Sequence, residues 1–151
     1  MKNFSIEMLT KRRLPEIIKI EEASTASHRW DEKELIKYFN KENTVGLLLQ
    51  NGIGTIGYCA FIIEKDRVSV DKLVIHSDYR RLKYGSALYE KIINGADNFS
   101  SHFSKIKFFN FFVEENDISS IKFFVSKSLP SKVAKKHYGE GQDAILFYLK
   151  K

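Results

Sequence analysis

The amino-acid sequence predicts one α/β domain in which helices pack on a mixed β-sheet. A length of 151 residues suits a single compact domain that spans residues 1–151. Hydrophobic residues make up 43% of the chain, which is enough for a core and argues against a disordered protein. Segments of strand-like alternation also take turns with segments of helical period, as in domains that combine both elements around one sheet.

The first predicted elements are a short strand and a helix. Apolar residues alternate with polar ones near the start of the chain, which indicates a strand at Phe4, Ile6 and Met8. The period then becomes helical, with apolar positions on one face at Leu14, Ile17, Ile18 and Ile20. Pro15 agrees with this start, because proline is tolerated in the first turn of a helix.

A second helix is predicted to begin near Asp31. Asp31 is a typical N-cap residue, and Glu34 follows three positions later, as in a capping box. Trp30, directly before the helix, is interpreted as a packing anchor, with a role in an acceptor groove as the alternative. The residues that this helix is expected to bury are Leu35, Ile36 and Phe39.

The middle of the chain predicts three consecutive strands. Residues 44–49 and 55–63 are rich in β-forming residues, and Asn51-Gly52 between them is a strong signal for a hairpin turn. A charged turn then leads into the third strand, residues 67–75. This strand ends in a continuous apolar run, as expected where both faces of a strand are covered: Leu73, Val74 and Ile75.

The remaining elements alternate between helices and strands. A helix follows whose apolar positions are Leu88, Ile92 and Ile93. A Phe-rich strand is predicted over residues 107–113, a helix over 118–128, and strands over 132–138 and 144–149. The complete order is β-α-α-β-β-β-α-β-α-β-β, which predicts an α/β domain around a mixed sheet.

The net charge of +6 agrees with a nucleic acid, an anionic membrane surface or a phosphorylated small ligand as partner. No stretch approaches the ~20 apolar residues that span a bilayer, and the amino terminus does not resemble a signal peptide, so we expect a cytoplasmic protein without membrane contact. Nucleic-acid binding is the weaker interpretation, because the clustered phenylalanines fit a core strand: Phe108, Phe109, Phe111 and Phe112.

Cys59 is the one cysteine of the chain, which excludes an intramolecular disulfide and a cysteine metal cluster. It lies in an apolar run, residues 56–63, so we expect a buried thiol. We predict no metal site, and the sequence leaves the oligomeric state open.

The strongest functional feature is the basic segment of residues 76–88, where a helix is predicted to begin. The N-terminus of a helix carries roughly +0.5 of an elementary charge, so acidic residues would stabilise it. The segment instead places Arg80, Arg81 and Lys83 there. An anionic ligand would make this arrangement favourable, and the small residues Gly85 and Ser86 would let a phosphate approach the backbone. The alternative is a solvated helix start that happens to be basic.

This segment, HSDYRRLKYGSAL, resembles the cofactor loop of the GNAT acetyltransferase superfamily, which reads Arg/Gln-x-x-Gly-x-Gly/Ala between a strand and a helix. The predicted element order is also the GNAT order over nearly the whole chain. Two further features resemble the ribosomal-protein-alanine N-acetyltransferase branch: Trp30-Asp31 before an apolar helix and Asp143-Ala144 at the last strand.

The resemblance implies acetyl-CoA as co-substrate. Backbone groups at the end of the third middle strand would hold the pantetheine arm, and amides of the basic loop would hold the pyrophosphate. The implied cofactor residues are Leu73, Val74, Ile75, Arg80, Arg81, Leu82, Lys83, Tyr84, Gly85, Ser86 and Asp117. The resemblance further implies direct acetyl transfer to an amine, with a base, backbone donors to the thioester carbonyl and a hydroxyl acid.

Several positions depart from the family pattern. Lys83 stands where the first loop glycine is usual, and a positive φ there would cost about 1 kcal/mol or more. Phe112 takes the place of the usual Glu base and Phe124 that of the usual Tyr acid, although phenylalanine can neither accept nor donate a proton. Asp117 replaces an Asn, and Ser128 replaces a Gly.

The proton-transfer groups are therefore unassigned, and the candidates are Glu114, Tyr138 and His76, with Glu115 and His137 as further neighbours. Each has a purely structural alternative. The two glutamates would be solvated, His76 would pack on the helix start, and Tyr138 would close the core beside the last strand.

Together these features predict an acetyl-CoA-dependent N-acetyltransferase acting on a primary amine, either a protein N-terminus, a lysine or a small amine. The alternative is a catalytically degenerate acetyl-CoA-binding regulatory protein, supported by Phe112, Phe124 and Lys83. A basic nucleic-acid-associated protein is the third hypothesis, and it rests on charge alone. No motif names the acceptor.

Overall fold

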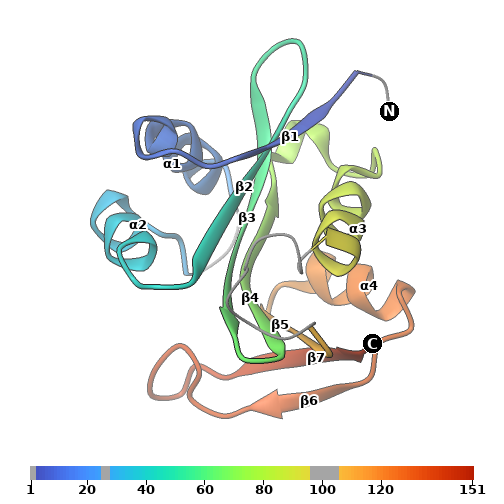
Figure 1. The fold of residues 1–151 in the computed structure, drawn as a ribbon. Helices are drawn as coiled ribbons and strands as arrows, with labels where there is room; N and C mark the ends of the chain where they lie inside the picture. Colours follow the sequence, from blue (N-terminus) through green and yellow to red (C-terminus); the bar gives the residue numbers. More distant parts are fainter. Residues whose placement is uncertain (1–2, 25–27, 96–105) are drawn as a thin grey trace.

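The computed structural model describes residues 3–24, 28–95 and 106–151 of the chain. Within them, seven strands form one mixed sheet in the order β1-β2-β3-β4-β5-β7-β6, with helices on both faces (Figure 1). The strands are β1 (Ser5–Met8), β2 (Thr44–Gln50), β3 (Thr55–Glu64), β4 (Arg67–Ile75), β5 (Phe108–Glu114), β6 (Ser131–Ala134) and β7 (Ala144–Lys150). The helices are α1 (Leu14–Glu22), α2 (Glu32–Phe39), α3 (Tyr84–Gly95) and α4 (Ile118–Ser126). The predicted order of strands and helices is confirmed.

Both predicted starts of the amino-terminal helices are also confirmed. α1 begins at Leu14, with Pro15 in its first turn. Before α2, the Asp31 carboxylate accepts a hydrogen bond from the backbone N–H of Glu34, and the Glu34 side chain accepts one from the N–H of Asp31. This reciprocal pair is the predicted capping box. Among the described residues, no helix combines the length and apolarity that a membrane span requires.

The buried face of α2 differs from the prediction. Leu35 is buried as expected, whereas Ile36 is 42% exposed and Phe39 is only half-buried. Tyr38 takes the buried position instead, because its hydroxyl donates a hydrogen bond to the Asp71 carboxylate of β4 at 2.8 Å. This bond turns the Tyr38 side of the helix toward the sheet.

The strand predicted over residues 132–138 is shorter than expected. β6 ends at Ala134, and the residues that follow form turns. Lys136 has a φ of 56° and so leaves the extended conformation, and its backbone N–H donates to the Asp143 side chain. The chain therefore turns away from β7 before Tyr138, which places Tyr138 outside the sheet.

The sheet divides the apolar core into two parts. On one face, α1 and α2 cover residues of β2 and β3 through Leu14, Ile17, Ile20, Leu35, Tyr38, Leu48, Tyr58 and Ala60. On the other face, α3 and α4 cover the alternate residues of the same strands, among them Leu47, Leu49, Cys59 and Phe61. Cys59 is fully buried, as predicted, and burial raises the pKa of its thiol.

Strands β4 and β5 are neighbours for only part of their length. They pair in parallel over four residues, and the pairing ends at Val70 and Phe111. Directly afterwards, Asp71 forms a bulge in the pairing of β4 with β3. β4 continues along β3 as far as Ile75, but no described strand pairs with its other edge beyond Val70. The sheet is therefore open between the ends of β4 and β5.

Phe109→Ala is expected to lower the free energy of unfolding by about 3–5 kcal/mol, because the Phe109 ring is fully buried and its loss leaves a cavity. Urea unfolding followed by circular dichroism measures the change. Phe108→Ala is the matched control on the adjacent, half-buried position of β5, and it should cost less than half as much. Equal losses would contradict the burial described for this strand.

Candidate active site

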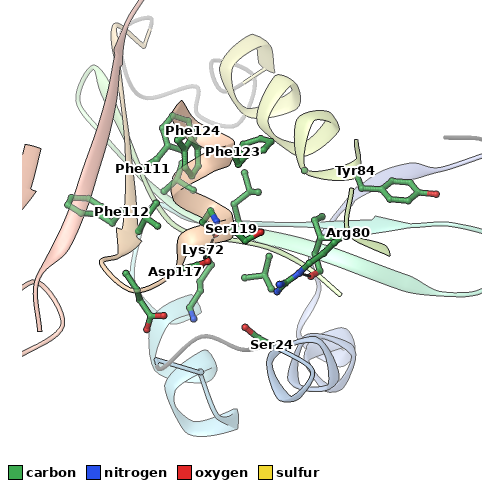
Figure 2. A pocket seen from close by; sticks show the side chains of 18 of the residues that line it. Ser24, Lys72, Arg80, Tyr84, Phe111, Phe112, Asp117, Ser119, Phe123 and Phe124 are labelled. Atoms are coloured by element: carbon green, nitrogen blue, oxygen red, sulfur yellow. Dashed lines mark hydrogen bonds between the residues drawn. The ribbon is translucent and has the colours of Figure 1, made fainter. Parts of the chain in front are cut away.

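A cleft opens where β4 and β5 separate. It has a volume of about 530 Å³ and is lined from β4, β5 and the starts of α3 and α4, with Ser24 from the connection between α1 and α2. In Figure 2 the rings of Phe111, Phe123 and Phe124 gather near α4, whereas Arg80 lies toward the start of α3. The aromatic rings and the side chain of Arg80 thus lie in different parts of the cleft.

The loop before α3 adopts an unusual backbone conformation. Arg81 and Lys83 have φ values of 63° and 67°, in the left-handed region that glycine normally occupies. Lys83 stands at the family's glycine position, and Ser128, at another such position, has a φ of 60°. Left-handed residues in turns direct backbone N–H groups into concavities that suit anions. The loop therefore combines cations with a backbone conformation suited to an anion.

The start of α3 is packed closely against its surroundings. A Cβ atom on Gly85 would lie 3.4 Å from the Phe123 ring and 3.9 Å from the Ile75 side chain. Lys127, directly after α4, donates to the Ser86 hydroxyl at 2.9 Å, and its ammonium lies 5.3 Å from the centre of the Phe123 ring. Lys127 thus adds a cation at the start of α3 that the sequence motif did not include.

Most of the predicted cofactor residues line this cleft: Leu73, Val74, Ile75, Arg80, Arg81, Lys83, Tyr84, Gly85, Ser86 and Asp117. Leu82 is not among the described residues that line the cleft, and it is 49% exposed. The Asp117 carboxylate caps α4 by accepting hydrogen bonds from the N–H and the hydroxyl of Ser120. Cofactor binding by these residues stays a prediction.

Two of the three proton-transfer candidates lie in the cleft. Glu114 and Tyr138 line it, whereas His76 is outside the set of described lining residues. The His76 ring instead caps the turn before the basic loop, with Nδ1 accepting the backbone N–H of Asp78 at 3.1 Å. The structure therefore favours the packing interpretation of His76.

Glu114 is buried, contrary to the expectation of a solvated carboxylate, and is 8% exposed. Its Oε1 accepts the backbone N–H of His28 at 2.5 Å, and Nε2 of His28 lies 3.9 Å from the same oxygen. The His28 ring stacks on the Tyr138 ring, with 4.6 Å between the centroids. Burial raises the pKa of Tyr138, and the charge of Glu114 acts in the same direction. Glu115, by contrast, is exposed, as predicted.

Phe112 and Phe124, which the family resemblance places at proton-transfer positions, have different surroundings. Phe124 is 3% exposed and stacks between Phe111 and Phe147, at 4.9 and 5.3 Å between centroids. Phe112 is half-buried in the cleft and stacks on His137 at 4.1 Å. Burial lowers the pKa of His137. Neither phenylalanine can accept or donate a proton.

A buried polar cluster supports the side of the cleft that faces α1. Glu21 is 1% exposed and accepts hydrogen bonds from the Tyr58 hydroxyl and the backbone N–H of Trp30. Nζ of Lys72 lies 3.2 Å from the Glu21 carboxylate and donates to the backbone carbonyl of His28 at 2.6 Å. A buried carboxylate without partners would be strongly destabilising, so this ion pair fixes α1 relative to β4.

Sequence reasoning missed His28, Asp71 and Lys72 as cleft residues. His28 belongs to no motif, and only the fold brings it to β5. Asp71 and Lys72 did carry a signal, because two charged residues precede the apolar run of a strand that was expected to be covered on both faces. Burial raises the pKa of Asp71, and the Tyr38 hydroxyl partly offsets this by donating to its carboxylate.

The fold and the cleft together define an acyltransferase-type α/β domain. A protein-family model described as the acetyltransferase (GNAT) family matches residues 13–127 of the chain. This span is well over half of the sequence, so the chain belongs to the GNAT acetyltransferase family, whose members transfer acetyl groups. No curated protein sequence gives a significant match.

Solved structures share the fold over the whole chain. The ribosomal-protein-S18-alanine N-acetyltransferase from Escherichia coli is 18% identical, with a TM-score of 0.79 over 97% of this chain and 93% of that one. Naa50 from Arabidopsis thaliana, in complex with the bisubstrate analogue CoA-Ac-MVNAL, is 17% identical, with a TM-score of 0.74 over 98% and 99%. A GNAT family acetyltransferase from Elizabethkingia anophelis with acetyl-CoA bound is 11% identical, with a TM-score of 0.76 over 100% of both chains. These likenesses confirm the predicted GNAT fold.

Lys83→Gly is expected to raise the free energy of unfolding by about 1 kcal/mol, because glycine adopts the left-handed conformation of this position without strain. Lys91→Gly is the matched control at an exposed position inside α3, where the same exchange should lower stability by roughly 0.5–1 kcal/mol. Denaturant unfolding measures both. A Lys83→Gly protein destabilised as much as the control would contradict the strain described for this loop.

Proposed function

We propose that this chain is an acetyl-CoA-dependent N-acetyltransferase that acts on a primary amine. The observation that carries the proposal is the position of the cleft between the open edge of β4 and the left-handed loop before α3. An open strand edge offers backbone groups to an extended, amide-bearing ligand. The start of a helix offers N–H groups and positive charge to phosphates. CoA carries both an amide-bearing arm and phosphates.

The residues of the cleft fit acetyl-CoA. The cations Arg80, Arg81 and Lys83 surround the start of α3, and Lys127 lies beside them. Nε of Arg80 donates to the backbone carbonyl of Ile75 at 3.3 Å, which ties the loop to the end of β4. Residues 73–75 would hold the pantetheine arm, and the loop would hold the pyrophosphate. The thioester of bound acetyl-CoA supplies an acyl carbon that is open to attack by an amine.

The other end of the cleft is acidic, which supports an amine as acceptor. Asp71, Glu114 and Asp117 line it, and their charges act with burial to raise the pKa of Tyr138. A primary amine is cationic at neutral pH, so carboxylates at this end attract it. They would repel an acidic acceptor. The acceptor class is therefore an amine-bearing protein or small molecule.

Turnover tests the proposal directly. The protein is mixed with acetyl-CoA and each of three amines, namely a peptide with a free amino terminus, a peptide whose only amine is a lysine, and spermidine. Release of the CoA thiol is then measured. We expect turnover of at least one amine above the rate without acceptor. Calorimetric binding of acetyl-CoA with no turnover of any amine would count against the proposal.

Gly85→Asp is expected to weaken the binding of both acetyl-CoA and CoA by roughly tenfold or more, or about 1.4 kcal/mol, because it adds a negative charge where phosphates are proposed to bind. Calorimetric titration measures the two Kd values. Gly52→Asp is the matched control, since a Cβ atom on Gly52 meets no other atom within 4 Å and Gly52 lies in the β2–β3 turn. Unchanged Kd values in Gly85→Asp would move the cofactor site away from this loop.

A regulatory protein that binds acetyl-CoA without catalysis is the second candidate function. It is favoured by one observation, that Phe112 and Phe124 occupy the family's proton-transfer positions. The double variant Phe112→Glu, Phe124→Tyr separates the two functions. Our proposal predicts that the unaltered protein already turns over an amine. Turnover that appears only in the double variant would support the regulatory function instead.

A further inference from the structure

The backbone of His28 connects the two strands that separate at the cleft. Its N–H donates to the Glu114 carboxylate of β5, and its carbonyl accepts a hydrogen bond from Nζ of Lys72 on β4. Lys72 is itself held by the buried carboxylate of Glu21 on α1. One residue of the α1–α2 connection is thus fastened to both sides of the cleft, which fixes where its side chain can lie.

The imidazole of His28 is held in the cleft and is accessible from it. The side chain is 30% exposed and lines the cleft. The ring lies nearly parallel to the Tyr138 ring, with 17° between the planes, and its Nε2 is 3.9 Å from the Glu114 carboxylate. A carboxylate close to an imidazole is favourable for the positive charge that the ring gains with a proton. The 3.9 Å separation is too long for a hydrogen bond, so the ring is positioned by the backbone bonds of His28 and by stacking on Tyr138.

Other groups of the cleft are less suited to this task. Phe112 and Phe124 have no atom that can take a proton. Burial keeps the Tyr138 hydroxyl protonated by raising its pKa. The Asp71 carboxylate accepts the Tyr38 hydroxyl and so is directed toward α2. His28 therefore remains as an accessible imidazole beside a buried carboxylate at the acidic end of the cleft.

We propose that His28 is the general base for the acceptor amine and that Glu114 is its positioning residue; this inference rests on the proposed acetyl transfer. The neutral imidazole takes one proton from the ammonium form of the acceptor. The freed lone pair forms the carbon–nitrogen bond with the acetyl carbonyl carbon while the carbon–sulfur bond breaks. The electron pair of that bond leaves on sulfur, the second amine proton neutralises the thiolate, and the imidazolium releases its proton to water.

The dependence of the rate on pH distinguishes this role from a structural one. Among the described residues, the other ionisable groups that line this end of the cleft are Asp71, Lys72, Glu114, Asp117 and Tyr138, and the charge of His137 acts on Asp71. An imidazole is the side chain that ordinarily exchanges a proton near neutral pH. We therefore expect kcat/KM to fall on the acid side of its pH profile, because a base that already carries a proton cannot accept one from the amine. His137 is the second imidazole in this region and is tested alongside.

The experiment measures kcat/KM from pH 5.5 to 9 with the best amine of the panel. In His28→Gln we expect kcat to fall at least about 100-fold. The decrease of kcat/KM toward low pH, here called the acid limb, should vanish in this variant. The Kd of acetyl-CoA, measured by calorimetry, should stay within about twofold of that of the unaltered protein. Imidazole added to the solution should raise the kcat of His28→Ala at least about tenfold. His137→Gln should keep the acid limb. Glu114→Gln should lower kcat about tenfold, and its exposed neighbour Glu115→Gln serves as the matched control.

The unaltered protein provides a second measurement that does not depend on the folding of variants. Diethyl pyrocarbonate is applied without acetyl-CoA, and the modified histidines are mapped by mass spectrometry. Loss of activity should follow modification of His28, and spermidine should slow that modification. Full activity with His28 modified, or an unchanged acid limb in His28→Gln, would overturn this inference alone. Absence of turnover in the unaltered protein would overturn the proposed function and this inference with it.

Discussion

The structure depends on one interruption, the end of pairing between β4 and β5 after Val70 and Phe111. Strand edges that pair with nothing are costly inside a protein, because each backbone N–H and carbonyl needs a partner. The bulge at Asp71 falls at this point, and bulges add twist and redirect side chains. The cleft lies at this opening in the sheet, and residues of the basic loop line it.

The two ends of the cleft differ in backbone conformation and in hydrogen bonding. At the basic end, Arg81 and Lys83 hold left-handed conformations that no side chain favours, as is common where a loop is shaped for a ligand. At the acidic end, the opening is bridged within the protein, since the backbone of His28 reaches both Lys72 and Glu114. The first end thus combines cations with left-handed backbone, and the second holds a carboxylate and a lysine that are hydrogen-bonded to one residue.

The sequence predicted the order of strands and helices correctly, because periodicity and local signals such as the capping box at Asp31 act within a few residues. The prediction of which side chains are buried was wrong where a side chain bonds to a residue far away in the sequence. Tyr38 is buried in place of Ile36 and bonds to Asp71, 33 positions away, and Glu114 is buried and bonds to His28, 86 positions away. Such long-range pairs leave no spacing pattern, so the sequence named Glu114, Asp117 and Tyr138 at the acidic end but missed His28, Asp71 and Lys72.

The buried pair of Glu21 and Lys72 has a consequence for how sequences of this kind can diverge. Either residue alone would leave an uncompensated charge, since Glu21 is 1% exposed and the side chain of Lys72 only 10%. Replacing one partner by an apolar residue is therefore tolerated only when the other is replaced as well. In relatives with this fold, we expect residues 21 and 72 either to be kept as the charged pair or to be replaced together, although 51 positions separate them.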